Sequence, residues 1–177
     1  NFYPKTSTGG PLLGEAVYNL VGGYPLELRN AVLNDSDPTN DNDYNNACAL
    51  RVSRALNYSG VVIPYIPNQT FLGADGKYYF LGARNLNKWM RKTFGTNDGD
   101  PNTPLNLNHI HITKSQAGPK GIELVTLLAG VKGIYSMVSD NPVWASGHAD
   151  LLKDNTACIN DCHFDGPIKY IDVWKLN

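Results

Sequence analysis

The chain has 177 residues and a mass of 19.4 kDa, enough for a single domain over residues 1–177 with a buried core. Apolar residues make up 42% and the formal net charge is −1, which excludes a disordered chain and gives no overall attraction to nucleic acid. No apolar run of about 18 residues occurs, so no membrane-spanning helix is predicted. The polar residues are largely uncharged and include 20 Asn and 10 Tyr, a composition common in proteins that work outside the cytosol or bind sugar-like polymers.

The first third of the chain predicts helices. Apolar residues recur at helical spacing in the first part of residues 11–33 and indicate a short amphipathic helix that ends at residues 22–23, which are both glycine. A further turn or two is expected over residues 26–33. The polar stretch 34–43 is predicted to be a loop.

The strongest helix prediction covers residues 45–56. Asn45 or Asn46 suits the N-cap, because its side chain accepts hydrogen bonds from first-turn amides, and Gly60 is a natural stop. Cys48 falls in the first turn of this helix. Its apolar stripe consists of Ala49, Val52, Ala55 and Leu56.

The middle of the chain is predicted to be extended and then helical. Two prolines make residues 61–66 an edge strand or an extended crossing. Asp75 and Gly76 indicate a hairpin turn between two short strands. A second helix is predicted over residues 86–94, capped by Asn85 and closed by the glycine at position 95, and a long polar loop follows it.

The last third of the chain predicts strands. Residues 122–129 are apolar and could form a helix, whereas residues 133–138, 147–152 and 168–176 are typical of strands. Helices first and strands later indicate an α+β domain with a mostly antiparallel sheet.

Cys48 is a candidate nucleophile. A helix N-terminus lowers the pKa of a thiol through its exposed amides and its dipole, and the thiolate is the reactive form. The same amides can hold the oxyanion of a tetrahedral intermediate. The alternative is a small buried core residue, since cysteines outside disulfides are among the most buried residues.

His148 is the candidate base among four histidines. It begins a predicted strand directly after Gly147, a residue that lets another backbone or a substrate approach closely. A cysteine on a helix followed by a histidine on a later strand is the order used by papain-like hydrolases. The alternative is an ordinary half-buried strand histidine.

His109 and His111 form an H-x-H pair on one face of a predicted strand, and such pairs can bind zinc. Cys158 and Cys162 could in principle add ligands, but no further ligand set stands at metal spacing. We therefore predict no metal and no cofactor, and interpret this strand as one with a polar outer face.

Cys158 and Cys162 are close enough in sequence to reach bridging distance on a loop or tight turn. In an oxidising compartment they would form a disulfide, and otherwise they are two reduced cysteines in a turn. A bridge would fix the direction of Asn160 and Asp161. Either an Asp or an Asn can hold the ring of a catalytic histidine.

Three features together resemble a known family. They are residues 46–53 (Asn-Ala-Cys-Ala-Leu-Arg-Val-Ser), residues 147–151 (Gly-His-Ala-Asp-Leu) and the Cys158/Cys162 pair. These segments are similar to the type VI secretion amidase effectors of the fourth amidase family, which are NlpC-type, papain-like peptidoglycan peptidases. The likeness spans roughly residues 12–177. Leu152 stands where the family commonly has Trp.

The resemblance implies a papain-like domain in which N-terminal helices pack on a mostly antiparallel sheet. It implies a toxin injected by one bacterium into the periplasm of another, where it cleaves the bond between γ-D-glutamate and meso-diaminopimelate in peptidoglycan. It also implies an immunity protein in the producing cell. By motif position Cys48 is the nucleophile and His148 the base, with Asp161 as the third residue and Asn160 as its alternative.

Two other functions fit the residues. One is a secreted carbohydrate-binding module without enzymatic activity, in which Cys48 is a core residue. The other is a cysteine peptidase with a different substrate. Rapid labelling of Cys48 by iodoacetamide near neutral pH would exclude the first, and the composition of released muropeptides would separate the second.

Overall fold

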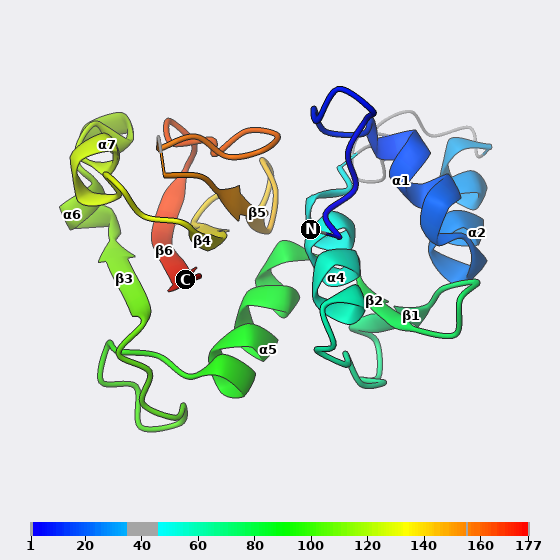
Figure 1. Cartoon of the computed structure of the whole chain (residues 1–177), viewed down its shortest axis with the longest axis horizontal. Helices are drawn as coiled ribbons and strands as arrows, with labels where there is room; N and C mark the ends of the chain where they lie inside the picture. The colour runs from blue at the N-terminus through cyan, green and yellow to red at the C-terminus, as the bar shows by residue number, and fades with distance from the viewer. Residues whose placement is uncertain (1, 35–45, 155, 177) are drawn as a thin grey trace. The chain divides into compact units, whose positions relative to one another are not determined.

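The computed structural model describes residues 2–34, 46–154 and 156–176, and the chain forms two compact units, residues 1–81 and 82–177 (Figure 1). Within those described stretches, no helix has both the length and the apolar character that crossing a bilayer requires. The predicted N-cap candidate Asn45 and the loop predicted over 34–43, apart from Asn34, fall outside the described residues.

The first unit consists of helices and a small hairpin. Helix α1 is followed at once by α2, and strands β1 and β2 pair antiparallel. The elements are α1 (Gly14–Val21), α2 (Gly23–Leu33), α4 (Cys48–Tyr58), β1 (Thr70–Leu72) and β2 (Tyr78–Phe80).

The predicted boundaries of these helices are largely confirmed. Helix α1 ends at Gly22, which has a φ of 61°, and its N–H donates to the carbonyl of Tyr18. Helix α2 has 11 residues and is therefore longer than the predicted turn or two. Residues 61–66 form neither a strand nor a helix, so the predicted edge strand is not present there.

Helix α4 is held by packing and by two buried polar side chains. Its predicted apolar stripe is buried throughout. On the same helix, Ser53 Oγ accepts a hydrogen bond from the Phe80 N–H at 3.1 Å, and Asn57 Nδ2 donates to the Tyr78 carbonyl at 2.8 Å. These bonds tie α4 to β2, so the position of its first residue is fixed by the core of this unit.

The second unit contains a four-stranded sheet in the order β3-β6-β4-β5, in which all neighbours are antiparallel (Figure 1). The predicted α+β class with a mostly antiparallel sheet is confirmed. The elements are α5 (Ala83–Phe94), β3 (His109–Thr113), α6 (Lys114–Ala117), the 3-10 helix η1 (Pro119–Gly121), α7 (Leu124–Leu127), β4 (Gly133–Ser139), β5 (Gly147–Leu152) and β6 (Ile168–Lys175).

Two predictions in this unit are wrong in detail. Helix α5 begins at Ala83 with Gly82 as its N-cap, so Asn85 lies inside the helix and does not cap it. The apolar residues 122–129 form only the four-residue helix α7. Leu124 and Leu128 are fully buried there, so tertiary packing uses these side chains without a long helix.

Side chains alternate across the sheet and give it two different faces. The register places His111 opposite Asp172 and Asp172 opposite Ser136, so these three share one face. His148 lies opposite Met137 and therefore belongs to the other face.

The two faces are covered differently. Helix α5 packs on the His111 face, where Asn87 donates to both Ser136 and Asp172. The His148 face carries an apolar core that includes Tyr135, Met137, Ile171 and Val173 together with Leu124, Leu128, Cys158 and Cys162.

Candidate active site

Cys48 is the first residue of α4, and its side chain is buried, with 3% of the residue exposed. The N-cap of α4 is Ala47 and no side chain caps it, so the predicted N-cap at Asn46 is wrong by one residue. Asn46 Oδ1 nevertheless accepts a hydrogen bond from the Cys48 N–H at 3.1 Å. The first intrahelical bond runs from the Arg51 N–H to the Ala47 carbonyl. The amides of Ala49 and Leu50 are therefore first-turn donors that have no acceptor within the helix.

The start of α4 is anchored on both sides of Cys48. Ala47 and Leu50 pack in one cluster with Val17 and Tyr18 of α1. Arg51 donates to the Leu12 carbonyl at 2.7 Å. Cys48 thus sits on a rigid element of the first unit, whereas the other predicted site residues all belong to the second.

His148 is the second residue of β5 and is buried, with 2% exposed, so it is not the half-buried strand histidine of the alternative interpretation. Gly147 before it allows a close approach, as predicted. A Cβ at this position would lie 2.2 Å from the Met137 carbonyl oxygen, so only glycine fits.

Asp150 is a site residue that the sequence interpretation missed. It is completely buried, and its Oδ2 lies 3.7 Å from His148 Nε2. The signal was present, because residues two apart on a strand share a face. No sequence pattern, however, indicates that the N–H groups of Asn160 and Asp161 both donate to this carboxylate.

His163 is a second residue beside His148 that was not predicted from the sequence as part of the site. Its ring centroid lies 4.6 Å from that of His148 in an edge-to-face arrangement. Burial and then the neighbouring His148 lower the pKa of His163, and these effects outweigh the opposing effect of Asp161. His148 has this effect because two adjacent imidazolium ions would repel each other. The lowered pKa keeps His163 neutral near pH 7.

Cys158 and Cys162 form a disulfide with a Cα–Cα distance of 5.1 Å, as predicted for an oxidising compartment, and Cys48 is not part of it. Asn160 and Asp161 between them are exposed and line a surface cavity of about 550 Å³. The Asp161 side chain is 61% exposed, and its Oδ1 accepts from the His163 N–H at 2.9 Å. The loop thus directs the N–H groups of residues 160 and 161 to Asp150, whereas the two side chains are exposed. Asp161 Oδ2 lies 3.7 Å from His163 Nδ1, whose ring packs against His148.

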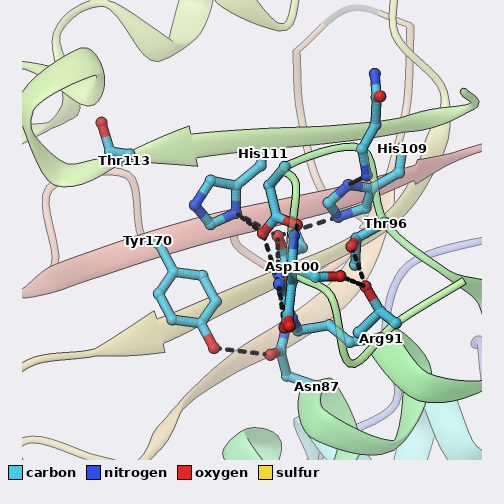
Figure 2. A network of polar contacts seen from close by, with 12 residues as sticks. Asn87, Arg91, Thr96, Asp100, His109, His111, Thr113 and Tyr170 are labelled. Atoms are coloured by element: carbon cyan, nitrogen blue, oxygen red, sulfur yellow. Dashed lines mark hydrogen bonds and ion pairs between the residues drawn. The ribbon is translucent and has the colours of Figure 1, made fainter. Parts of the chain in front are cut away.

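A second histidine–aspartate cluster lies on the opposite face of the sheet (Figure 2). Asp172 Oδ1 is 3.0 Å from His109 Nε2 and 2.7 Å from His111 Nδ1. The predicted polar outer face of β3 is therefore wrong, because His109 is buried against this carboxylate. The Asn97 N–H donates to His109 Nδ1, so His109 Nε2 carries the proton that it donates to Asp172.

Positive charge and amide donors complete this cluster. Arg91 Nη1 lies 3.1 Å from both oxygens of Asp172, and Asn87 Nδ2 donates to Oδ2 at 2.9 Å. Burial alone would raise the pKa of Asp172, but the hydrogen bonds from the two histidines and Asn87, with the charge of Arg91, hold that pKa far below its usual range.

Asp98, His111 and Asp172 each offer one ligand atom, and these atoms lie within 4.8 Å of one another. Arg91 Nη2, however, lies 2.5 Å from Asp98 Oδ2, and Arg91 Nη1 also pairs with Asp172. The guanidinium thus occupies the carboxylate oxygens that a metal ion would coordinate. The disulfide removes the two cysteines that the sequence offered as further ligands. The cluster is therefore an ion-pair network in which Arg91 pairs with both Asp98 and Asp172.

A protein-family comparison defines the class of this α+β protein, since the family's sequence profile matches residues 44–174. This range contains both Cys48 and His148, and the class is that of amidase effectors of the type VI secretion system (T6SS). The family is type VI secretion system amidase effector protein 4, Tae4, and the chain belongs to it.

Solved structures of Tae4 share the fold. Tae4 of Enterobacter cloacae in complex with Tai4 superposes with a TM-score of 0.68 at 23% identity, covering 94% of this chain and 90% of that chain. Tae4 of E. cloacae alone gives 0.66 at 24% identity, covering 94% and 88%. The Salmonella typhimurium Tae4/Tai4 system gives 0.65 at 21%, covering 94% and 90%. The predicted papain-like α+β fold is thereby confirmed. A comparison with curated proteins gives no match.

Proposed function

We propose that this Tae4 family member is a cysteine amidase that cleaves peptidoglycan stem peptides, at the bond between γ-D-glutamate and meso-diaminopimelate. Membership of an amidase effector family supports hydrolysis of an amide bond. The observation that carries the cysteine mechanism is the position of Cys48 as the first residue of an anchored helix. There the helix dipole and the first-turn amides favour the thiolate.

In the proposed reaction the Cys48 sulfur attacks the scissile carbonyl carbon while His148 takes the thiol proton. The first-turn amides of Ala49 and Leu50 are the candidate donors to the resulting oxyanion. Collapse of the intermediate expels the amine, which takes the proton from His148 and leaves a thioester. Water, deprotonated by His148, then releases the acid and regenerates the thiol.

The third residue of the triad is proposed to come from the disulfide loop. Asp161 is the favoured candidate because a carboxylate stabilises an imidazolium better than an amide does, and Asn160 is the alternative. We propose that residues 1–177 form a single catalytic domain, to which the first compact unit contributes Cys48 and the second contributes His148.

The proposed setting is interbacterial. The effector family supports delivery through the type VI secretion system, and a peptidoglycan substrate places the action in the periplasm of the target cell. That compartment is oxidising, which agrees with the Cys158–Cys162 bridge. Related Tae4 proteins have been solved with Tai4 immunity proteins, and we propose a cognate immunity protein for this chain as well.

The test is digestion of purified sacculi followed by mass spectrometry of the released muropeptides. Wild-type protein is expected to release fragments that end in γ-D-glutamate. Cys48→Ala should remain folded and lose activity by about three orders of magnitude or more, because it removes the nucleophile. Substantial turnover by Cys48→Ala above a host-protease control would exclude Cys48 as the nucleophile. If wild-type protein leaves sacculi intact while iodoacetamide labels Cys48 rapidly, the substrate is a different one.

A further inference from the structure

We propose that Asp150 is a positioning residue of the active site, which holds the disulfide loop, residues 158–162, against the strand that carries His148. The catalytic part of this inference rests on the proposed function. The geometric part rests only on contacts within the second unit, between β5 and the segment that follows it.

The disulfide loop returns along β5 before it turns away. Leu152 and Cys158 form an antiparallel bridge, and the Ile159 N–H donates to the Leu151 carbonyl at 3.1 Å. The next two N–H groups, of residues 160 and 161, turn to the Asp150 side chain and reach its Oδ2 at 2.9 and 3.2 Å. A side-chain carboxylate thus continues the strand pairing at the point where the loop bends.

The energetics favour a strong anchor. Asp150 is 0% exposed, and its second oxygen, Oδ1, accepts from the Leu151 N–H at 2.7 Å. Hydrogen bonds from backbone N–H groups to a carboxylate are charge-assisted and are roughly twice as strong as neutral ones. Without the carboxylate, three N–H donors would lose their acceptor, which is costly wherever water cannot replace it.

The same anchor acts on the candidate base. The oxygen that holds both loop amides is the one 3.7 Å from His148 Nε2. His163, whose ring packs against the His148 ring, follows the loop directly after Cys162. A shift of the loop would therefore move two groups that lie against His148, namely the Asp150 carboxylate and the His163 ring.

Asp150→Ala and Asp150→Asn test this inference, because Asn keeps one accepting oxygen at nearly the same position. In Asp150→Ala we expect kcat on soluble muropeptides to fall about 10- to 100-fold with KM within threefold, since small misplacements of a catalytic group cost rates of this size. Asp150→Asn should retain part of the activity. Hydrogen exchange of the backbone amides of residues 160 and 161, measured by NMR, should accelerate most in Asp150→Ala and less in Asp150→Asn.

Asp172→Asn is the matched control, because it removes a buried carboxylate from the other face of the same sheet. It is expected to lower stability while leaving kcat within threefold at temperatures where it is folded. If it does not fold, Asp98→Asn, at the rim of the same network, replaces it. Iodoacetamide alkylation of Cys48 separates the two effects: a displaced base slows alkylation, whereas partial unfolding accelerates it.

Two results would overturn the inference. One is an Asp150→Ala protein in which the amides of residues 160 and 161 keep their protection. The other is a variant that has lost this protection but keeps kcat and alkylation rate within threefold of wild type. If wild-type protein leaves sacculi intact, the proposed function fails, whereas the amide exchange and the alkylation rates still decide whether Asp150 holds the loop and sets the base.

Discussion

The two faces of the β3-β6-β4-β5 sheet each place a histidine beside a buried aspartate, but the two aspartates receive their contacts differently. Asp172 is held by side chains, including the guanidinium of Arg91. Asp150 receives the backbone amides of a disulfide-closed loop and lies 3.7 Å from His148. A carboxylate neutralised by a fixed cation serves stability, whereas one that holds a loop can position the groups which that loop carries.

This contrast shows why residue types alone do not identify an active site. His109 and His111 resemble a metal-ligand pair in sequence, yet both rings point to one carboxylate within a network that Arg91 completes. His148 has a less conspicuous sequence context. Its ring nevertheless packs against that of His163, which directly follows the disulfide loop.

Replacing one histidine on each face by alanine should produce the largest difference in hydrolytic activity between the two faces. His148→Ala is expected to lower sacculus hydrolysis by about three orders of magnitude, because loss of one member of a triad removes most of its effect. His111→Ala should keep activity within a few-fold. Equal losses in the two folded variants, measured by muropeptide release, would contradict the assignment of chemistry to one face.

Removing the carboxylate on the α5 face should produce the largest loss of stability. Asp172→Asn removes the buried charge that Arg91, His109 and His111 share, although Arg91 keeps Asp98 and Asp100 as partners. Breaking a buried ion pair costs up to about 3–5 kcal/mol of unfolding free energy. Urea unfolding measures this. Asp140→Asn is the matched control: Asp140 pairs with Lys114 at the surface, where such a pair contributes less than about 1 kcal/mol. Similar losses in both variants would show that burial of the Asp172 network does not matter.

Opening the disulfide should affect activity more than stability. Closing so short a loop contributes about 2 kcal/mol or less, so the Cys158→Ser/Cys162→Ser protein should remain folded with a slightly lower Tm. We expect sacculus hydrolysis to fall by about tenfold if the bridge aims the loop. Full activity would show that Asp150 and the backbone pairing suffice. Thiol counting under oxidising conditions should find one thiol, on Cys48, and three would show that no bridge forms.

The smallest expected effect concerns acid stability on the α5 face. Burial raises the pKa of Asp98, but hydrogen bonds from Arg91 and Thr96 outweigh it and lower that pKa to about 2. The pKa of Asp172 is also lowered. Carboxyl groups with a lowered folded-state pKa stabilise the fold above their unfolded pKa of about 4, and this contribution is lost as the pH falls through the folded-state value.

Asp98→Asn should therefore flatten the loss of unfolding free energy between about pH 4 and pH 2 relative to the wild-type chain. Denaturant unfolding at a series of pH values measures both slopes. The same slope in Asp98→Asn and wild type would contradict the lowered pKa.

Much of the fold could be predicted from the sequence, because local signals specify it. The apolar stripe of α4, the glycine that ends α1 and the turn at Asp75–Gly76 each act within a few residues, and each prediction is confirmed. Predictions failed where packing outweighs local preference. Asn85 has the side chain of a cap but lies within α5, and the apolar residues 122–129 are buried without forming a long helix.

The sequence by itself also determined the candidate nucleophile, the candidate base and the cysteine pair, since position on an element and spacing along the chain suffice for these. Only the tertiary structure decided which carboxylate each histidine meets. Asp172 follows His111 by 61 residues, and strand pairing alone brings them together. Asp150 stands two residues from His148, yet its hold on the disulfide loop depends on how the chain returns along β5. Such contacts leave no local pattern, because long-range backbone register creates them.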